Sequence, residues 1–340
     1  EHFNTVLYTG TGGTYPSTVQ SVTGVGFEPS WTWIKIRSQA YQHFIYDAVR
    51  GATKVIYSDS TAAEATGNQM TSFNSDGFTV ANISTGVATN ASGESFVAWN
   101  WKANGSGSSN TDGSITSTVS ANVDAGFSIV SYTGNGTAGA TVGHGLGATA
   151  DFVIVKGREN TEAWQVISKA MDADQFIQLD STTSQLSQGT YNMFNSTRPS
   201  TTVVTLGNLA HTNQNNLDYI MYAFAEKDGY SKFGSYTGNG NADGTFVYTG
   251  FRPAYVMAKR TDVNGNSWSI KDTKRFPNNV MNGYLFADSS SAEGTASSLD
   301  IDFTSNGFKW RGTSSDGNHN SGNYIYIAFA ETPFKYSNAR

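Results

Sequence analysis

The chain of 340 residues contains no cysteine. Neither a disulfide nor a thiolate metal site can therefore stabilise its fold. Charged residues make up only 14% of the chain, and their net charge is −6. Because no excess of positive charge is available to neutralise phosphates, neither nucleic acid nor an anionic membrane is expected as a partner.

Long hydrophobic stretches are missing as well. No run of about 18 apolar residues occurs, so no membrane insertion is expected. The first four residues, Glu-His-Phe-Asn, lack the basic and apolar regions of a signal peptide. Proline is scarce at 6 residues, whereas glycine numbers 36 and aromatic residues make up 13%. This composition favours strands and tight turns over helices.

The sequence repeats itself along its length. Ser-Tyr-Thr-Gly-Asn-Gly at 131–136 returns at 235–240, and a looser copy occupies 7–12. Gly-Phe-x-Pro follows the first copy at 26–29 and the third copy at 250–253. Such ordered self-similarity indicates three tandem modules of about 100 residues each.

Further markers follow in the same order in each copy. An apolar strand ends in a lysine, at Lys35, Lys156 and Lys259. An aromatic strand comes next, with matching residues that we expect to form a repeated core, at Phe44, Trp164 and Trp268. An acidic turn follows, at Asp59, Asp180 and Asp288.

Two hairpin turns are predicted in the first and third copies. Asp-Gly at 76–77 and Asn-Gly at 306–307 each stand between two apolar segments. Such pairs favour type I′ turns because both residues tolerate positive φ. We therefore expect Gly77 and Gly307 to have positive φ.

Each copy closes on an aromatic-rich segment that is apolar on both faces, at 96–101, 219–226 and 324–331. A strand of this kind must be covered on each side, which favours a central position in a sandwich of two sheets. The sequence therefore predicts an all-β fold of three tandem antiparallel β-sandwich modules of jelly-roll or lectin-like type.

The module boundaries follow from these closing strands. They are expected at 1–103, 125–230 and 231–340, with 104–124, rich in Gly, Ser and Thr, as a linker or exposed excursion. The short joint at 226–231 predicts close docking of the second and third modules. The longer segment 104–124 is expected to leave the first module more freedom. We expect a close-packed triplet or a ring with approximate threefold symmetry, with the linker exposed.

Catalytic motifs are not evident. The five histidines have no metal-binding spacing, and neither a Gly-x-Ser-x-Gly nucleophile motif nor a phosphate-binding loop occurs. Asp59 with Glu64, and Asp288 with Glu293, recur at one spacing, and a glycosidase needs two such carboxylates. Because both pairs flank a predicted turn, where Asp accepts backbone hydrogen bonds, we expect no catalytic residues and no enzyme activity.

One segment has the composition of a calcium loop. Asp262, Asn264 and Asn266 match the start of such a loop, but no bidentate Glu stands at its twelfth position. A hairpin turn explains the segment without a metal. Calcium is thus the one cofactor that the sequence leaves open, and no other metal site is expected.

Ligand-binding candidates are aromatic residues without counterparts in the other copies. Tyr41 lies in a polar loop that also contains Arg37, and Trp310 with Arg311 follows the third Gly-Phe. Aromatic faces and arginines can contact sugars, although packing within a sandwich also explains each of them.

These motifs resemble a repeated domain of virion proteins from tailed bacteriophages, especially marine and cyanobacterial ones. The similarity covers nearly the whole chain and weakens in the second module, where Gly-Leu-Gly-Ala at 145–148 replaces Gly-Phe-x-Pro. The segment at 328–340 is similar to the closing segment of such chains, which implies that Arg340 is the natural end.

The resemblance implies a particle component built from lectin-like sandwiches. We expect a non-enzymatic virion surface protein of the tail fibre or receptor-binding type, made in the host cytoplasm. Its expected partners are other virion proteins and host-surface polysaccharide, and a homo-oligomer is left open. The alternatives are a capsid decoration or fibre protein without a host ligand, and a glycan depolymerase.

Overall fold

The computed structural model describes residues 2–83 and 88–330, so most of the closing segment 328–340 lies outside the described residues. Strands dominate the described chain, which contains no α-helix and one short 3-10 turn at Ser297–Leu299. All pairings between its strands are antiparallel. The prediction of an all-β sandwich fold is confirmed.

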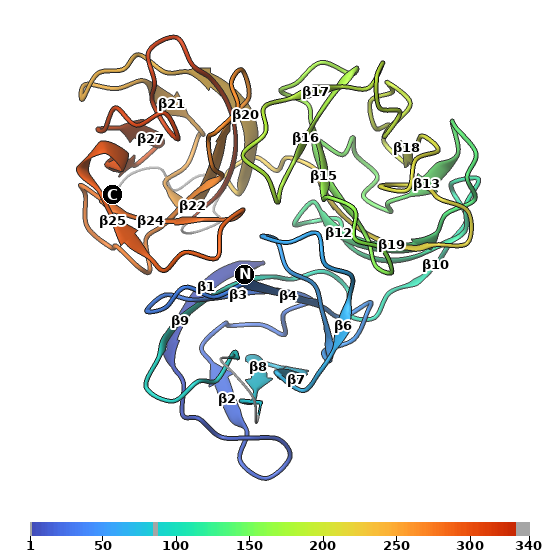
Figure 1. Cartoon of the computed structure of the whole chain (residues 1–340), viewed down its shortest axis with the longest axis horizontal. Coiled ribbons are helices and arrows are strands. Elements are labelled where there is room, and N and C mark those ends of the chain that lie inside the picture. The colour runs from blue at the N-terminus through green and yellow to red at the C-terminus, as the bar shows by residue number, and fades with distance from the viewer. Residues whose placement is uncertain (1, 84–87, 331–340) are drawn as a thin grey trace.

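The sheets fall into three groups along the chain (Figure 1). The first unit, residues 3–101, contains a sheet in the order β1-β9-β3-β4, a sheet β2-β8-β7 and a short pair β5-β6. Its strands are β1 (Phe3–Thr9), β2 (Gln20–Thr23), β3 (Trp31–Ile36), β4 (His43–Asp47), β5 (Lys54–Val55), β6 (Ala65–Thr66), β7 (Met70–Asn74), β8 (Gly77–Val80) and β9 (Ser95–Trp101).

The second unit, residues 108–224, contains a large sheet in the order β10-β11-β12-β19-β14-β15-β16-β17 and a pair β13-β18. Its strands are β10 (Ser108–Asn110), β11 (Ser117–Asn122), β12 (Phe127–Thr133), β13 (Thr141–Gly143), β14 (Phe152–Gly157), β15 (Gln165–Ser168), β16 (Gln175–Gln178), β17 (Leu186–Ser187), β18 (Val203–Thr205) and β19 (Asp218–Phe224).

The third unit, residues 231–330, pairs a large sheet β20-β28-β22-β23-β24-β25 with a small sheet β21-β27-β26. Its strands are β20 (Ser231–Thr237), β21 (Phe246–Tyr248), β22 (Pro253–Arg260), β23 (Ser269–Asp272), β24 (Gly283–Phe286), β25 (Gly294–Thr295), β26 (Ile301–Thr304), β27 (Gly307–Trp310) and β28 (Asn323–Ala330).

The closing strands β9, β19 and β28 lie centrally in their sheets, as their two-sided apolar pattern predicts. In β28 the alternation is complete, because Ile325, Ile327 and Phe329 face a core shared by all three units, whereas Tyr324 and Tyr326 face the core of their own unit. Each large sheet is therefore buried on both faces.

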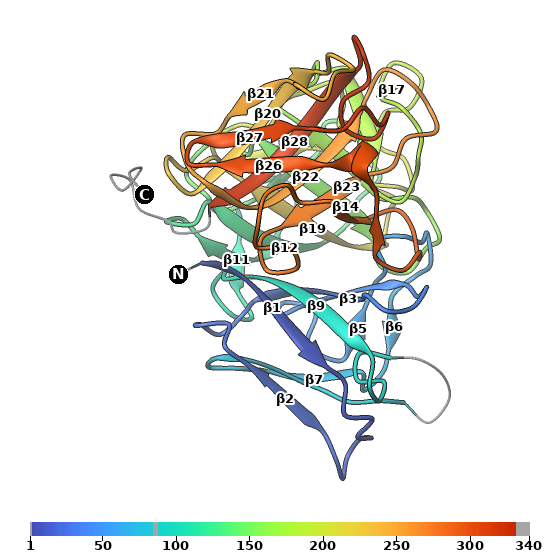
Figure 2. The same ribbon diagram turned by 90° about the vertical axis from the view of Figure 1, so that its left-hand side faces the viewer.

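The shared core occupies the centre of the molecule. It joins aromatic residues of all three units, among them Trp31, Trp101, Phe224 and Phe329. Trp31 stacks on Tyr222 of the second unit with ring centroids 4.6 Å apart. Figures 1 and 2 show the three units side by side around this centre. The arrangement agrees with the expectation of a close-packed triplet.

The segment 104–124, interpreted from the sequence as a linker or an exposed excursion, carries two strands of the second unit, so the linker interpretation is corrected. Strands β10 and β11 lie within it, and β11 pairs with β12 from Ser117–Tyr132 to Asn122–Phe127. The segment extends the edge of the second large sheet, so it does not leave the first unit free to move. Its small polar residues suit an edge strand, which sequence composition does not distinguish from a linker.

Both predicted hairpins form, but not as type I′ turns. Asn74 pairs with Gly77 and Thr304 with Gly307, so each glycine begins the second strand instead of lying within the loop. Gly77 has a φ of 149°, whereas Gly307 is not among the glycines with positive φ. A Cβ on Gly307 would lie 2.1 Å from the carbonyl oxygen of Val247 on β21. The expected positive φ therefore holds for Gly77 alone. A Cβ on Gly77 would lie 2.0 Å from the carbonyl oxygen of Val22 on β2, so close approach of a third strand accounts for both glycines.

Candidate binding surfaces

The three units contact one another in a cyclic order, first on second, second on third and third on first. Three backbone hydrogen bonds repeat at these interfaces, from Glu64 to Arg158, from Gln185 to Thr261 and from Glu293 to Arg37, with N–O distances of 2.7, 2.9 and 2.8 Å. The order of donors and acceptors is the same each time. The molecule therefore has approximate threefold symmetry in its interfaces.

The lysines that end the repeated strands connect the units. The Nζ atoms of Lys35, Lys156 and Lys259 donate to the carbonyl oxygens of Ser290, Thr61 and Ser181, each at 3.1 Å. Burial lowers the pKa of each lysine to about 8. These lysines are structural contacts between units, which the sequence pattern alone did not indicate.

The acidic turns face the same interfaces. Asp59, Asp180 and Asp288 accept backbone N–H groups from His43, Trp164 and Trp268, as the turn interpretation expects. Burial raises the pKa of Asp59 and of Asp180 to about 6. This pattern also shows that His43, not Phe44, is the counterpart of the two tryptophans, so the sequence match is off by one residue.

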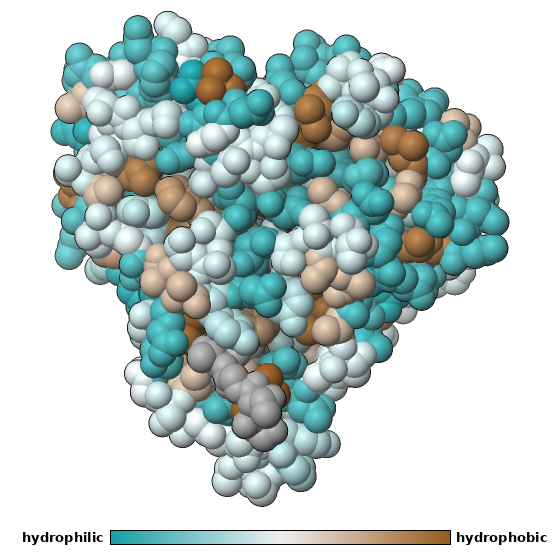
Figure 3. All heavy atoms as spheres, viewed as in Figure 1, coloured by the Kyte–Doolittle hydropathy of each residue, from teal (hydrophilic) through white to brown (hydrophobic). Residues whose placement is uncertain are grey.

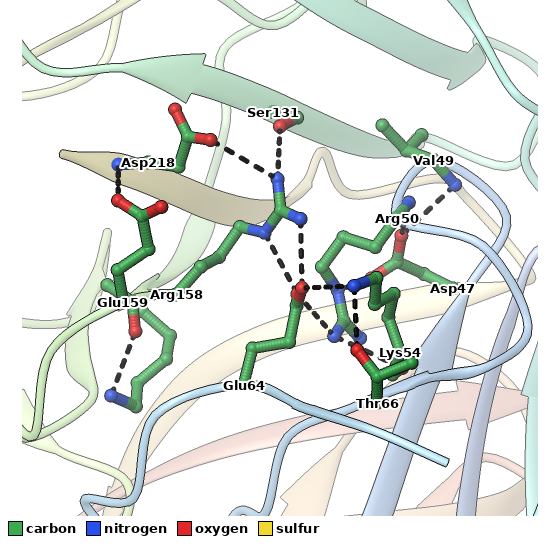
Figure 4. Close-up of polar contacts among 12 residues, drawn as sticks. Asp47, Val49, Arg50, Lys54, Glu64, Thr66, Ser131, Arg158, Glu159 and Asp218 are labelled. Carbon is green, nitrogen blue, oxygen red and sulfur yellow. Dashed lines mark hydrogen bonds and ion pairs between the residues drawn. The ribbon is translucent and has the colours of Figure 1, made fainter. Parts of the chain in front are cut away.

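An ion-pair cluster joins the first and second units (Figure 4). Arg158 contacts Glu64 with an Nε–Oε2 distance of 2.9 Å and approaches Asp218 at 3.9 Å. Arg50 reaches the same Glu64 carboxylate at 3.2 Å. Burial alone would raise the pKa of Glu64, but the two arginines lower it below its usual value.

The same cluster recurs between the third and first units. Arg37 contacts Glu293 at 2.7 Å, and Arg275 reaches the same carboxylate at 3.0 Å. Arg37, a ligand candidate from the sequence, is thus occupied at an interface. Tyr41 is half-buried, stacks on Phe44 with centroids 5.8 Å apart, and its carbonyl accepts a hydrogen bond from Lys35. The structure therefore places these two candidates in packing contacts.

The other sequence candidates are also placed by the structure. Trp310 is 1% exposed and lies in the core of the third unit, so it cannot stack on a ligand. Arg311 lies at the surface and contacts Asp302 at 3.0 Å.

The calcium candidates make separate local contacts. Both carboxylate oxygens of Asp262 accept hydrogen bonds from Arg260, at 2.8 and 3.0 Å. The Asn264 side chain accepts the backbone N–H of Ser184, and the Asn266 amide donates to the carbonyl of Val263. Among residues 2–83 and 88–330, no group of three or more His, Asp or Glu side chains is placed to hold a metal.

Apolar residues lie scattered among polar ones on the face seen down the shortest axis (Figure 3). Isolated apolar residues of this kind are ordinary on protein surfaces. A paired aromatic feature lies on the small sheet of the third unit, which is in front of the large sheet in Figure 2. Phe246 and Tyr248 on β21 are 44% and 62% exposed, whereas Val247 between them is buried.

Charged residues lie on the same small sheet as these rings, on β27 and β26. Phe246 pairs with Lys309 of β27, which pairs with Asp302 of β26. Lys309 contacts Asp243 at 2.5 Å, and Arg311 contacts Asp302. We name this set, Phe246, Tyr248, Asp302, Lys309 and Arg311, the outer aromatic face.

The outer aromatic face occurs in the third unit alone among the described residues. The matching positions of the first unit, Ser21, Thr23 and Thr79, are small and polar, and β13 of the second unit carries Thr141 and Gly143. Phe246 and Tyr248 are not among the ligand candidates expected from the sequence. Their alternation around Val247 is the period of a half-buried strand and could have identified them.

The structure therefore defines an all-β protein in which three sheet units close around one shared core. The chain belongs to the DUF7483 family, a domain of unknown function, whose model matches residues 1–333. No curated protein and no solved structure matches the chain. Within its described residues, no helix has the length and hydrophobicity needed to cross a membrane.

Proposed function

We propose that this chain is a non-enzymatic surface protein of a bacteriophage virion that adheres to host-surface glycans. Other virion proteins hold it on the particle, and it is made in the host cytoplasm. The resemblance of its repeated motifs to phage virion proteins supports the location, and the outer aromatic face supports the adhesion.

Sugars present two kinds of surface that this face matches. Their C–H faces are apolar and pack on exposed aromatic rings such as Phe246 and Tyr248. Their hydroxyl groups donate to carboxylates and accept from cations, and Asp302, Lys309 and Arg311 supply both on the sheet that carries the rings. The small polar counterparts in the other units make the third unit the adhesive one.

The engagement of the paired carboxylates supports a non-enzymatic role over a glycan depolymerase. Glu64 and Glu293 are each held by two arginines, and for Glu64 these arginines lower the pKa, which favours the ionised form over a proton-donating acid. Asp59 and Asp288 each accept a backbone N–H. A glycosidase needs one carboxyl free to donate its proton to the leaving group.

A capsid decoration protein without a host ligand is the second candidate. The cyclic arrangement of three similar units around one core favours it, because such a body fits a threefold position of a symmetric shell.

Binding to purified host polysaccharide tests the proposal. We expect immobilised polysaccharide to retain the protein, and a Phe246→Ala, Tyr248→Ala variant to bind at least about tenfold more weakly. The matched control is Ser21→Ala, Thr23→Ala on the equivalent strand of the first unit, which should bind like the native chain. Equal binding by both variants, no retention at all, or release of new reducing ends from the polysaccharide would contradict the proposal.

A further inference from the structure

A groove of about 430 Å³ lies between the second and third units. The second unit contributes Gln175 and Gln185 to its wall, and the third unit contributes Ser235, Thr261 and Asn323. This volume lies within the range of about 300–1,000 Å³ that small-ligand sites occupy.

The groove exists because this interface lacks the ion pair of the other two. Gln185 stands where the other interfaces have Glu64 and Glu293, and Thr261 stands where they have Arg158 and Arg37. Figure 4 shows the filled counterpart, in which the Arg158 guanidinium lies among Glu64, Ser131 and Asp218. A threonine side chain is far shorter than arginine, so the corresponding space stays open.

Deeper in this interface, the polar and charged residues found in the other two interfaces are also replaced. In the first unit Asp47 pairs with Arg50 and accepts a hydrogen bond from Tyr222 of the second unit at 2.7 Å.

Asp272, Arg275 and Trp99 repeat that arrangement between the third and first units. At the interface with the groove the corresponding residues are Ser168, Met171 and Ile327, and Met171 also lines the groove. Charged groups are therefore replaced on both sides of one interface together, which leaves a groove surface without cations among the described residues.

The chemistry of the lining is that of a site for uncharged polar molecules. No Lys or Arg lines the groove among the described residues, and Asp172 is its only charged residue. The side chains of Gln175, Gln185 and Ser235 make no hydrogen bond within the described chain, so their donors and acceptors are free for a ligand.

We propose that this groove binds one sugar unit of a neutral saccharide, which is an uncharged and hydroxyl-rich ligand. It is separate from the outer aromatic face, which lies on the small sheet of the third unit. The proposal therefore does not depend on adhesion through that face, and the Phe246→Ala, Tyr248→Ala variant should keep the groove site.

Restoring the missing ion pair tests the groove. The probes are D-glucose, D-galactose, D-mannose and N-acetyl-D-glucosamine, each measured by saturation-transfer NMR with the full chain. We expect transfer to at least one sugar. The Gln185→Glu, Thr261→Arg variant should fill the groove as Glu64 and Arg158 do in the first interface, and should lose that signal while melting at or above the native temperature.

A second variant guards against a folding defect in the first. Gln185→Leu removes polar atoms that have no partner within the described chain, so it should melt like the native protein and bind the sugar at least about tenfold more weakly. Absence of transfer to all four sugars would overturn the proposal. So would undiminished transfer with both variants.

Discussion

Some charged residues at the interfaces pair with a residue of another unit. Removing such a charge should lower the free energy of unfolding by a predictable amount. Glu64→Gln takes the carboxylate away from Arg158 and Arg50. We expect a loss of about 1.5–3 kcal/mol in the free energy of unfolding, because charge-assisted hydrogen bonds in a half-buried site are lost. The control is Asp243→Asn, since Asp243 is exposed and pairs only at the surface, where such pairs contribute little. Denaturant titration of the two variants distinguishes them, and equal stability would contradict the role of Glu64.

Asp180 gives a prediction for pH. Burial raises its pKa in the folded chain to about 6 from an ordinary value of 3.8. Folding favours the neutral form of the Asp180 carboxyl. The contribution of this carboxyl to the free energy of unfolding is therefore full below about pH 4 and is lost as the pH rises through about 6. Asp180→Asn keeps an oxygen for the Trp164 N–H but does not ionise. The melting temperature of the variant minus that of the native chain should therefore rise across this window and then level off, and a flat difference would contradict the assignment.

At the scale of strands, the sequence predicts what depends on the alternation of apolar residues and misses what depends on a neighbouring strand. The central positions of β9, β19 and β28 follow from their two apolar faces. The edge strand β10 and its neighbour β11 lack apolar residues on two faces and look like a linker. Trp310 seemed available for a ligand because no other copy matched it, but the burial of its side chain depends on the sheet packed above it. The groove likewise depends on contacts between units, which no local sequence pattern contains.

Gly307 tests the explanation of the hairpins. Gly307→Ala should destabilise the chain by about 1–3 kcal/mol, because its Cβ would lie 2.1 Å from the Val247 carbonyl oxygen and must displace β21. Gly189→Ala is the matched control, since its Cβ would meet only the Ser187 hydroxyl at 3.4 Å. Thermal melting of both variants decides the point. If Gly307→Ala melts like Gly189→Ala, close approach of β21 does not explain the glycine.

At the scale of the whole molecule, the shared core determines how the chain unfolds. Each large sheet contributes one face to this core, so separation of any unit would expose Trp31, Phe224 or Phe329 and their neighbours to water. Units joined by a flexible linker would unfold independently, whereas units that share a core should unfold together.

We therefore expect one cooperative transition in calorimetry, with equal calorimetric and van't Hoff enthalpies. A substitution confined to one interface should move the entire transition. Glu64→Gln, which weakens the contact of the first unit with the second, should lower a single melting temperature without splitting the peak. Two or more resolved transitions in the native chain, or a separate low-temperature peak in the variant, would mean that the units are energetically independent despite their common core.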